Sequence, residues 1–148
     1  MAEMKSKAYV YKNSIEWEIE RKGVISSENK PDIKVATPPE FKGHPSIWTP
    51  EDFFVASVNT CIMTTFLHYA EINKLNFVSY KSEAQGVLER IDRQFMFSSI
   101  KIMPLITVRQ ESDINMAKDL IVLSENNCLI SNSIKSEVTV MPEIILSL

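Results

Sequence analysis

The chain has 148 residues, a length that predicts one domain, residues 1–148, with a single hydrophobic core. Apolar residues make up 45% of it and charged residues 24%, which is typical of a globular protein and excludes long disordered tracts. The net charge of −3 offers no basic surface for a phosphate backbone, so nucleic acid is not an expected partner. The first 23 residues alternate charged with apolar side chains, without the apolar core of a signal peptide. We therefore expect a soluble, cytoplasmic protein with no membrane partner.

The first third of the chain predicts a small β meander. Residues 14–20 (SIEWEIE) alternate strictly, so we expect a half-buried strand with Ile15, Trp17 and Ile19 on its buried face. Further short strands are expected at residues 8–12, 24–27 and 32–36, with a polar turn (ENKP) before the last of them. Residues 37–48 contain three prolines and a glycine, and such a long loop is typical of a segment that forms a site.

A long helix is expected to start after this loop. Thr49 is a suitable N-cap, Pro50 suits the first helical position, and Glu51 and Asp52 suit the positive end of the helix dipole. Residues 53–70 are apolar or small nearly all the way round, which predicts a central helix buried on most sides. The charged residues 71–74 should end it.

The second half predicts a β hairpin, a helix and a final strand. Residues 77–90 and 95–110 read as strands joined by a turn at Asp92 and Arg93, and Pro104 predicts an edge position or a bulge. Ser112 is expected to cap a second helix that runs to about residue 127, with Asn126 and Asn127 at its C-terminal end. Residues 137–146 read as the last strand. Strands and helices are thus segregated, which indicates an α+β fold.

Cys61, within the first helix, and Cys128, just after the second, leave a redox or catalytic use open. A structural disulfide is not expected in the cytosol, and composition alone favours free cysteines that pack as small apolar side chains. The two cysteines and two histidines lack the short paired spacings of zinc sites, so we expect no metal and no cofactor.

The two histidines are poor candidates for a catalytic base. His68 follows Cys61 by seven residues on the same helix face, but this spacing separates their backbones by about 10 Å. A base must hydrogen-bond its nucleophile at roughly 3 Å, so we expect His68 to be a core or interface residue. His44, in the proline-rich loop, is expected to be solvated and to lie outside the mechanism.

Two separated segments resemble the OsmC/Ohr family. One is PEFKGHPSIWTPEDFFVASVNTCIMTTF followed by AEINKL, in which a Pro-Glu helix start precedes a buried cysteine. The other is NNCLISNSI, where Leu129 stands at the position of a common family proline. With the meander, hairpin and final strand in the family order, the resemblance covers residues 14–144. It implies an intertwined homodimer with the central helices inside.

The resemblance implies a thiol peroxidase that reduces organic hydroperoxides and is regenerated by a dithiol reductant. Cys61 falls on the peroxidatic cysteine and Cys128 on the resolving cysteine. Glu51 falls on the helix-start glutamate, ten residues before Cys61, and Arg21 corresponds to the arginine that pairs with it. Such an arginine would offset the burial of the thiolate, and Glu51 would hold its guanidinium in place.

Helix geometry leaves open how Glu51 serves the Cys61 site, because ten helical residues span about 15 Å. The helix could break near residues 57–59, the arginine could bridge the gap, or Glu51 could serve the other subunit. Aromatic and methionine side chains could line an apolar entrance for the peroxide or belong to the core: Trp48, Phe53, Phe54, Met63 and Phe66. Two other functions stay open: a dimeric protein that binds a small hydrophobic ligand in a cleft between subunits, and a cysteine hydrolase.

Overall fold

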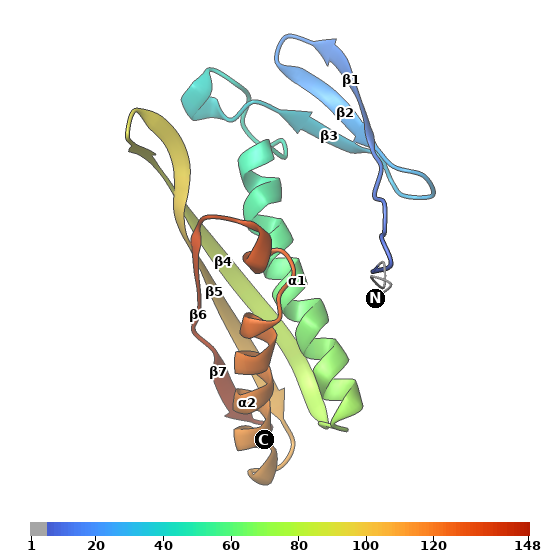
Figure 1. Ribbon diagram of the computed structural model, residues 1–148, viewed down its shortest axis with the longest axis vertical. Helices are drawn as coiled ribbons and strands as arrows, with labels where there is room; N and C mark the ends of the chain where they lie inside the picture. Colours follow the sequence, from blue (N-terminus) through green and yellow to red (C-terminus); the bar gives the residue numbers. More distant parts are fainter. Residues whose placement is uncertain (1–5) are drawn as a thin grey trace, which may run out of the picture. The chain divides into compact units, whose positions relative to one another are not determined.

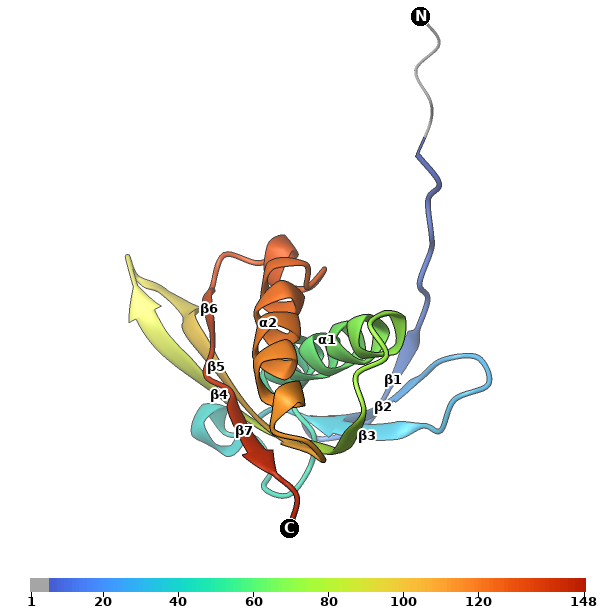
Figure 2. The ribbon, with the colours of Figure 1, turned by 90° about the horizontal axis from the view of Figure 1, so that it is seen from below.

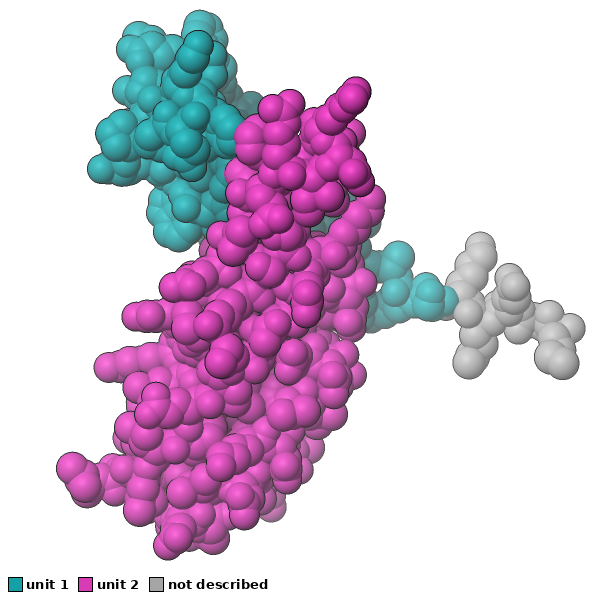
Figure 3. Space-filling model, turned by 90° about the vertical axis from the view of Figure 1, so that its left-hand side faces the viewer, with its two compact units in different colours: residues 1–52 teal, residues 53–148 magenta. Residues whose placement is uncertain are grey.

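The computed structural model describes residues 6–148, which fall into two compact units that meet at Asp52 and Phe53. The elements follow one another as three strands, a long helix, a hairpin, a second helix and two short strands (Figure 1). This arrangement confirms the α+β prediction. The two units are coloured separately in Figure 3. A single domain over residues 1–148 stays a prediction.

Unit 1 contains an antiparallel meander of β1 (Ser14–Ile19), β2 (Lys22–Ser26) and β3 (Ile33–Ala36), in that spatial order. The meander was predicted, but residues 8–12 are not a strand. The prediction of a half-buried β1 was wrong, because every residue of the strand is exposed. Ile15, Trp17 and Ile19 are 70%, 72% and 58% exposed, since no layer of this unit covers their face of the sheet.

The loop after β3 folds back on the meander through backbone hydrogen bonds. It contains a 3-10 turn, η1 (Pro39–Phe41), and the N–H of Gly43 donates to the carbonyl oxygen of Pro38 at 3.0 Å. A Cβ atom on Gly43 would collide with the backbone of Thr37, so this close approach requires glycine. The N–H of Ala36 donates to the carbonyl oxygen of Trp48 at 2.9 Å and fixes where the loop ends.

Helix α1 (Pro50–Ile72) begins as predicted. The hydroxyl of Thr49 accepts the N–H of Asp52 at 3.1 Å, and the carboxylate of Asp52 accepts the N–H of Thr49 at 3.0 Å. This reciprocal pair is a capping box. Among residues 6–148, α1 alone is long and apolar enough to cross a membrane, a test that the core helix of a soluble protein also passes.

A smaller part of the surface of α1 is buried than the sequence predicted. Four of its residues are buried, at a spacing of four, and form one stripe: Val58, Ile62, Phe66 and Ala70. Apolar residues on other faces stay open, and Leu67 and Ile72 are 38% and 61% exposed. A helix buried on most sides was therefore the wrong expectation for the single chain, because its own sheet covers only one face.

Unit 2 is built on a long hairpin of β4 (Phe77–Ile91) and β5 (Gln94–Val108). The predicted turn is confirmed: Asp92 and Arg93 have φ angles of 48° and 69°, and two positive φ angles give the twist that joins hairpin strands. Helix α2 (Ser112–Asn126) and α1 lie on the same face of the sheet (Figure 2). Alternate β5 residues face them and form the core with both helices: Ile100, Ile102, Ile106 and Val108.

Two short strands, β6 (Glu137–Val140) and β7 (Glu143–Leu146), replace the single final strand that the sequence predicted. Both pair with β5 in parallel, β6 with residues 99–102 and β7 with residues 105–108. Pro104 lies opposite the break between them. The prediction of an edge position or bulge was therefore wrong: β5 is an inner strand, and the proline occupies a gap in the neighbouring ladder.

The ends of α2 differ in part from the prediction. Ser112 is the first helical residue and does not cap the helix, because its hydroxyl contacts the side chain of Gln110 and the capping position is Glu111. The C-terminal end agrees with the prediction: the N–H of Asn127 donates to the carbonyl oxygen of Leu123 at 3.1 Å. Cys128 follows directly.

Candidate active site

The two cysteines come together in unit 2, although 67 positions separate them in the sequence. Cys61 lies in the middle of α1, is partly exposed, and packs against the core. Cys128 is fully buried within the core, directly after α2. The two sulfurs are close enough for each to shift the pKa of the other, and both are free thiols. The fold thus joins the two residues that the sequence marked for redox chemistry.

The turn after α2 lies beside both sulfurs. The backbone of Leu129 and Ile130 is close enough to the sulfur of Cys61 to lower its pKa. The N–H of Ser131 donates to the sulfur of Cys128 at 3.5 Å. The next N–H, that of Asn132, donates to the carbonyl oxygen of Cys128 at 3.1 Å and closes the turn.

Cys61 is the more acidic thiol of the pair. Burial raises its pKa, but the hydrogen bonds from Ile130, Cys128, Thr65 and Leu129 together outweigh burial and leave the pKa below the ordinary value. A sulfur that accepts several hydrogen bonds is stabilised as the anion. Cys61 is therefore suited to be the nucleophile, because the thiolate is the reactive form of cysteine.

Cys128 has the opposite shift. Burial raises its pKa, Ser131 lowers it in part, and the neighbouring Cys61 with its negative charge raises it further. Two sulfurs this close do not both ionise readily, so when the pair loses its first proton, Cys61 is the thiol that loses it more easily. The arrangement is a more acidic, partly exposed Cys61 next to a less acidic, buried Cys128.

Sequence reasoning missed Thr65 and Ser131. The hydroxyl of Thr65 lies 3.9 Å from the sulfur of Cys61, and helical spacing of four residues was a signal that could have found it. Ser131 lies three residues after Cys128, but its role depends on the turn. The backbone donors of Leu129 and Ile130 leave no signal in side-chain chemistry.

Arg21 and Glu51 both lie in unit 1, and the structure does not pair them within residues 6–148. Arg21 follows β1, and its Nη1 donates to the carbonyl oxygen of Phe41 at 2.8 Å. Oε2 of Glu51 is buried, and no group of the described residues hydrogen-bonds to it. Helix α1 is continuous from Pro50 to Ile72, so the helix break considered near residues 57–59 does not occur. The buried oxygen of Glu51 remains able to accept a donor.

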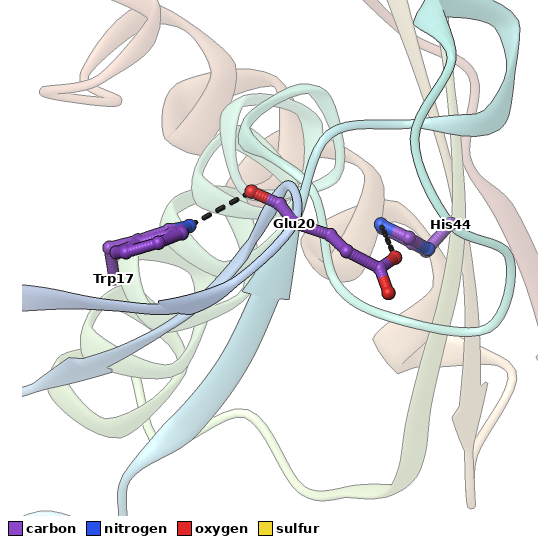
Figure 4. A network of polar contacts seen from close by, with 3 residues as sticks. All are labelled: Trp17, Glu20 and His44. Carbon is purple, nitrogen blue, oxygen red and sulfur yellow. Dashed lines mark hydrogen bonds and ion pairs between the residues drawn. The ribbon is translucent and has the colours of Figure 1, made fainter.

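The histidines differ in part from the expectation, and an interface position of His68 stays a prediction. His44 is not simply solvated: its Nε2 lies 3.3 Å from a carboxylate oxygen of Glu20 (Figure 4). The backbone carbonyl of Glu20 also accepts the indole N–H of Trp17 at 2.8 Å, so the strand end and the loop are linked. His68 is not a core residue, since it is exposed and contacts the ring of Tyr69 edge-on at 5.3 Å.

The candidate entrance residues divide between the core and the surface. Phe66 is fully buried and packs against the rings of Phe77 and Tyr80, so it belongs to the core. Phe54 is partly buried and stacks on Phe97 at 4.9 Å. Trp48 is 52% exposed and lines an open cavity of unit 1, of about 540 Å³, together with Glu51.

Comparison with known proteins decides the family. The sequence profile described as OsmC-like protein matches residues 43–143, more than half of the chain. The chain belongs to the OsmC-like family. The matched range contains Glu51, Cys61 and Cys128 and begins after Arg21. A search of the curated proteins found none that matches this OsmC-like chain.

Solved structures agree with the OsmC-like fold. An OsmC-like protein of unknown function from Vibrio cholerae is 21% identical, with a TM-score of 0.82 over 93% of this chain and 100% of its own. An organic hydroperoxide resistance protein from Elizabethkingia anophelis is 18% identical, with a TM-score of 0.75 over 97% and 100%. One from Legionella pneumophila is 19% identical, with a TM-score of 0.68 over 97% and 100%. The predicted resemblance and fold are confirmed.

Proposed function

We propose that the protein is a thiol-dependent peroxidase that reduces organic hydroperoxides through the Cys61 thiolate and a Cys61–Cys128 disulfide. The observation that carries the proposal is the opposite acidity of two neighbouring thiols. Hydrogen bonds keep the pKa of Cys61 low, while burial and the adjacent negative charge keep the pKa of Cys128 high. A peroxidase needs one ionised sulfur to attack and one protonated sulfur in reserve.

In the first step, the thiolate of Cys61 attacks the terminal peroxide oxygen, and the O–O bond breaks. Cys61 becomes a sulfenic acid and the alkoxide leaves. In the second step, Cys128 ionises and attacks the sulfenic sulfur, which forms the disulfide and expels hydroxide. The proton that Cys128 gives up balances the alkoxide, which leaves as the alcohol. A dithiol then returns the disulfide to two thiols by exchange.

We propose that Arg21 and Glu51 act on the bound peroxide and take no part in forming the disulfide. A guanidinium can donate to both peroxide oxygens and stabilise the leaving alkoxide. The unpaired, buried Oε2 of Glu51 supports a role in holding such a donor, since a buried carboxylate oxygen without a partner is costly. Because α1 is continuous, Glu51 is too far along the helix to contact Cys61 of the same chain directly. Glu51 therefore acts on Cys61 through a bridging arginine, or it contributes to the Cys61 site of the other subunit.

The expectation of a homodimer is supported by apolar surface that the single chain leaves uncovered. Ile15, Trp17 and Ile19 form an exposed apolar row on β1, and Leu67 and Ile72 are exposed on α1. Large apolar side chains that gather on an exposed strand face support a contact with another chain. Sedimentation equilibrium should give twice the chain mass, and Trp17→Glu should lower it.

Organic hydroperoxides are the proposed substrates because the printed names of the Elizabethkingia and Legionella proteins point to this class. Stopped-flow mixing of the reduced protein with cumene hydroperoxide and, separately, hydrogen peroxide tests the proposal. We expect faster thiol loss with cumene hydroperoxide and one disulfide between Cys61 and Cys128 by mass spectrometry. Cys61→Ser should abolish consumption, and Cys128→Ser should allow a single turnover that ends at Cys61 sulfenic acid.

His68→Gln provides the matched control, because His68 is exposed on the same helix and seven residues separate its backbone from that of Cys61 by about 10 Å. It should turn over as the unmodified protein does, whereas a cysteine hydrolase using His68 as its base would lose activity. Unchanged peroxide consumption in Cys61→Ser would disprove the peroxidase. Inert thiols together with a copurified hydrophobic compound would favour the alternative function of ligand binding.

A further inference from the structure

The 3-10 turn η2 (Ser131–Ser133) begins three residues after Cys128 and carries two serine hydroxyls that are used differently. The hydroxyl of Ser133 donates to the carbonyl oxygen of Leu129 at 2.7 Å. The hydroxyl oxygen of Ser131 is buried, and no group between residues 6 and 148 forms a hydrogen bond with it. A buried hydroxyl without a partner destabilises a protein, so its presence close to Cys128 requires an explanation.

The backbone of Ser131 shows which atom this hydroxyl can serve. The N–H of Ser131 donates to the sulfur of Cys128 at 3.5 Å. Only the Cα and Cβ atoms separate the nitrogen of a serine from its hydroxyl oxygen, so rotation about χ1 can bring the hydroxyl to the same sulfur. Cys128 is fully buried, and a negative charge on its sulfur therefore depends on donors that the protein supplies.

Such a charge must form in the second step of the proposed cycle. In the reduced protein, burial raises the pKa of Cys128 and Ser131 lowers it only in part, so this thiol keeps its proton at neutral pH. Cys128 attacks the sulfenic acid as a thiolate, because a protonated thiol is a weak nucleophile. A donor that is unpaired before Cys128 ionises and paired afterwards stabilises the thiolate selectively and so speeds the attack.

We propose that Ser131 positions and activates Cys128 for disulfide formation, because its hydroxyl joins its N–H as a hydrogen-bond donor to the sulfur when Cys128 loses its proton. This inference rests on the proposed function and adds a positioning residue to its second step. The proton of Cys128 goes to the alkoxide, the S–S bond forms, and the bond from the Cys61 sulfur to oxygen breaks, so that hydroxide leaves. Ser131 keeps its own proton throughout.

Ser131→Ala removes the hydroxyl and keeps the N–H, and Ser133→Ala is the matched control within the same turn. The hydroxyl of Ser131 has no partner among residues 6–148, so reduced Ser131→Ala should lose no stability to urea at pH 7. Ser133→Ala loses the hydrogen bond to Leu129 and should unfold at a lower urea concentration. A Ser131→Ala protein that is destabilised as much as Ser133→Ala, or that fails to fold, would make Ser131 a structural residue and overturn the inference.

A titration follows the ionisation of Cys128 in Cys61→Ser, in which Cys128 is the only thiol. The Cβ shift of ¹³C-labelled cysteine is recorded by NMR as pH is varied, and no peroxidase activity is needed. Adding Ser131→Ala should raise the midpoint by about one pH unit, the order expected for the loss of one hydrogen bond to a charged atom. Adding Ser133→Ala should leave the midpoint in place. An unchanged midpoint after Ser131→Ala would overturn the inference.

A single-turnover experiment separates the two steps of the cycle. Reduced protein with both cysteines is mixed with an equimolar amount of cumene hydroperoxide, and dimedone-trapped sulfenic acid and disulfide are quantified over time by mass spectrometry. Ser131→Ala should oxidise Cys61 at the normal rate and form the disulfide about tenfold more slowly, whereas Ser131→Thr keeps a hydroxyl and should restore the rate. Equal slowing in Ser133→Ala would overturn the inference. A protein that consumes no hydroperoxide but shows the shifted Cys128 midpoint would disprove only the peroxidase.

Discussion

The hydroxyl oxygen of Thr65 lies 3.9 Å from the sulfur of Cys61, one turn further along α1. As a donor it stabilises the thiolate, so Thr65→Val should raise the pKa of Cys61 without changing the volume of the side chain. We expect alkylation of Cys61 at pH 7 to slow about fivefold, the value of one neutral hydrogen bond. Thr65→Ser keeps the hydroxyl and should react as the unmodified protein. An unchanged rate in Thr65→Val would remove Thr65 from the site.

The two thiols should titrate in separate steps. Absorbance at 240 nm should show Cys61 ionising first, below the ordinary thiol range, and Cys128 ionising above it. In Cys61→Ser the remaining thiol loses the neighbouring negative charge that raises its pKa, so Cys128 should ionise at a lower pH than before. An unchanged or higher Cys128 midpoint in this variant would contradict the coupling of the two sulfurs.

The same shifts predict how stability depends on pH. The lowered pKa of Cys61 stabilises the folded protein above the unfolded thiol pKa, and this contribution falls as pH drops through the folded value. The raised pKa of Cys128 stabilises it below the unfolded value, and this contribution is lost as pH rises through the folded one. Urea unfolding of Cys128→Ser at high pH should therefore show a weaker loss of stability than the unmodified protein.

Gly86 of β4 leaves room for two side chains of unit 2. A Cβ atom there would lie 2.5 Å from Cγ2 of Val55 and 3.0 Å from Cε1 of Phe97. Gly86→Ala should therefore lower the free energy of unfolding by about 1–3 kcal/mol, as measured by urea denaturation. The double variant Gly86→Ala with Val55→Ala removes the closer contact and should be more stable than Gly86→Ala alone. If Gly86→Ala has the same free energy of unfolding as the unmodified protein, α1 can move away from β4 at little cost.

Tyr80 carries a largely buried hydroxyl that packs beside Phe66. Burial raises its pKa to about 12, with the side chain of Ser82 lowering it in part. Because the folded pKa exceeds the unfolded one, this stabilisation is present below pH 10 and is lost as pH rises towards 12. Tyr80→Phe should flatten this alkaline loss, by on the order of 1 kcal/mol after solvent screening. If the unmodified protein and Tyr80→Phe lose equal stability at alkaline pH, the ionised Tyr80 side chain must be solvated in the folded protein.

Local signals predicted most of the fold correctly. The capping box at Thr49 and Asp52 and the turn at Asp92 and Arg93 depend on neighbouring residues, so sequence was sufficient. The position of Pro104 was misjudged because the gap that accommodates it is formed by a distant segment, residues 141–142, where β6 gives way to β7. Whether a proline fits a strand depends on the neighbouring ladder.

Burial was harder to predict than secondary structure. The alternation in β1 and the apolar run in α1 both indicated covered faces, yet the single chain covers only one stripe of α1 and none of β1. An apolar pattern indicates that a face of an element is buried, but it does not show whether the same chain or another chain buries it. For the site, the cysteines were found from a family resemblance, whereas the donors of the turn are backbone atoms that carry no residue signature.

The unequal exposure of the two sulfurs has a consequence for the return to the reduced state. Cys128 is fully buried, and Cys61 is the sulfur that a second molecule can approach. In the proposed cycle an incoming thiol would therefore attack Cys61, where the mixed disulfide would form, and Cys128 would be released as a buried thiol. In this cycle the second thiol of the dithiol donor releases Cys61, so a donor that has lost its second thiol should stay covalently attached to Cys61.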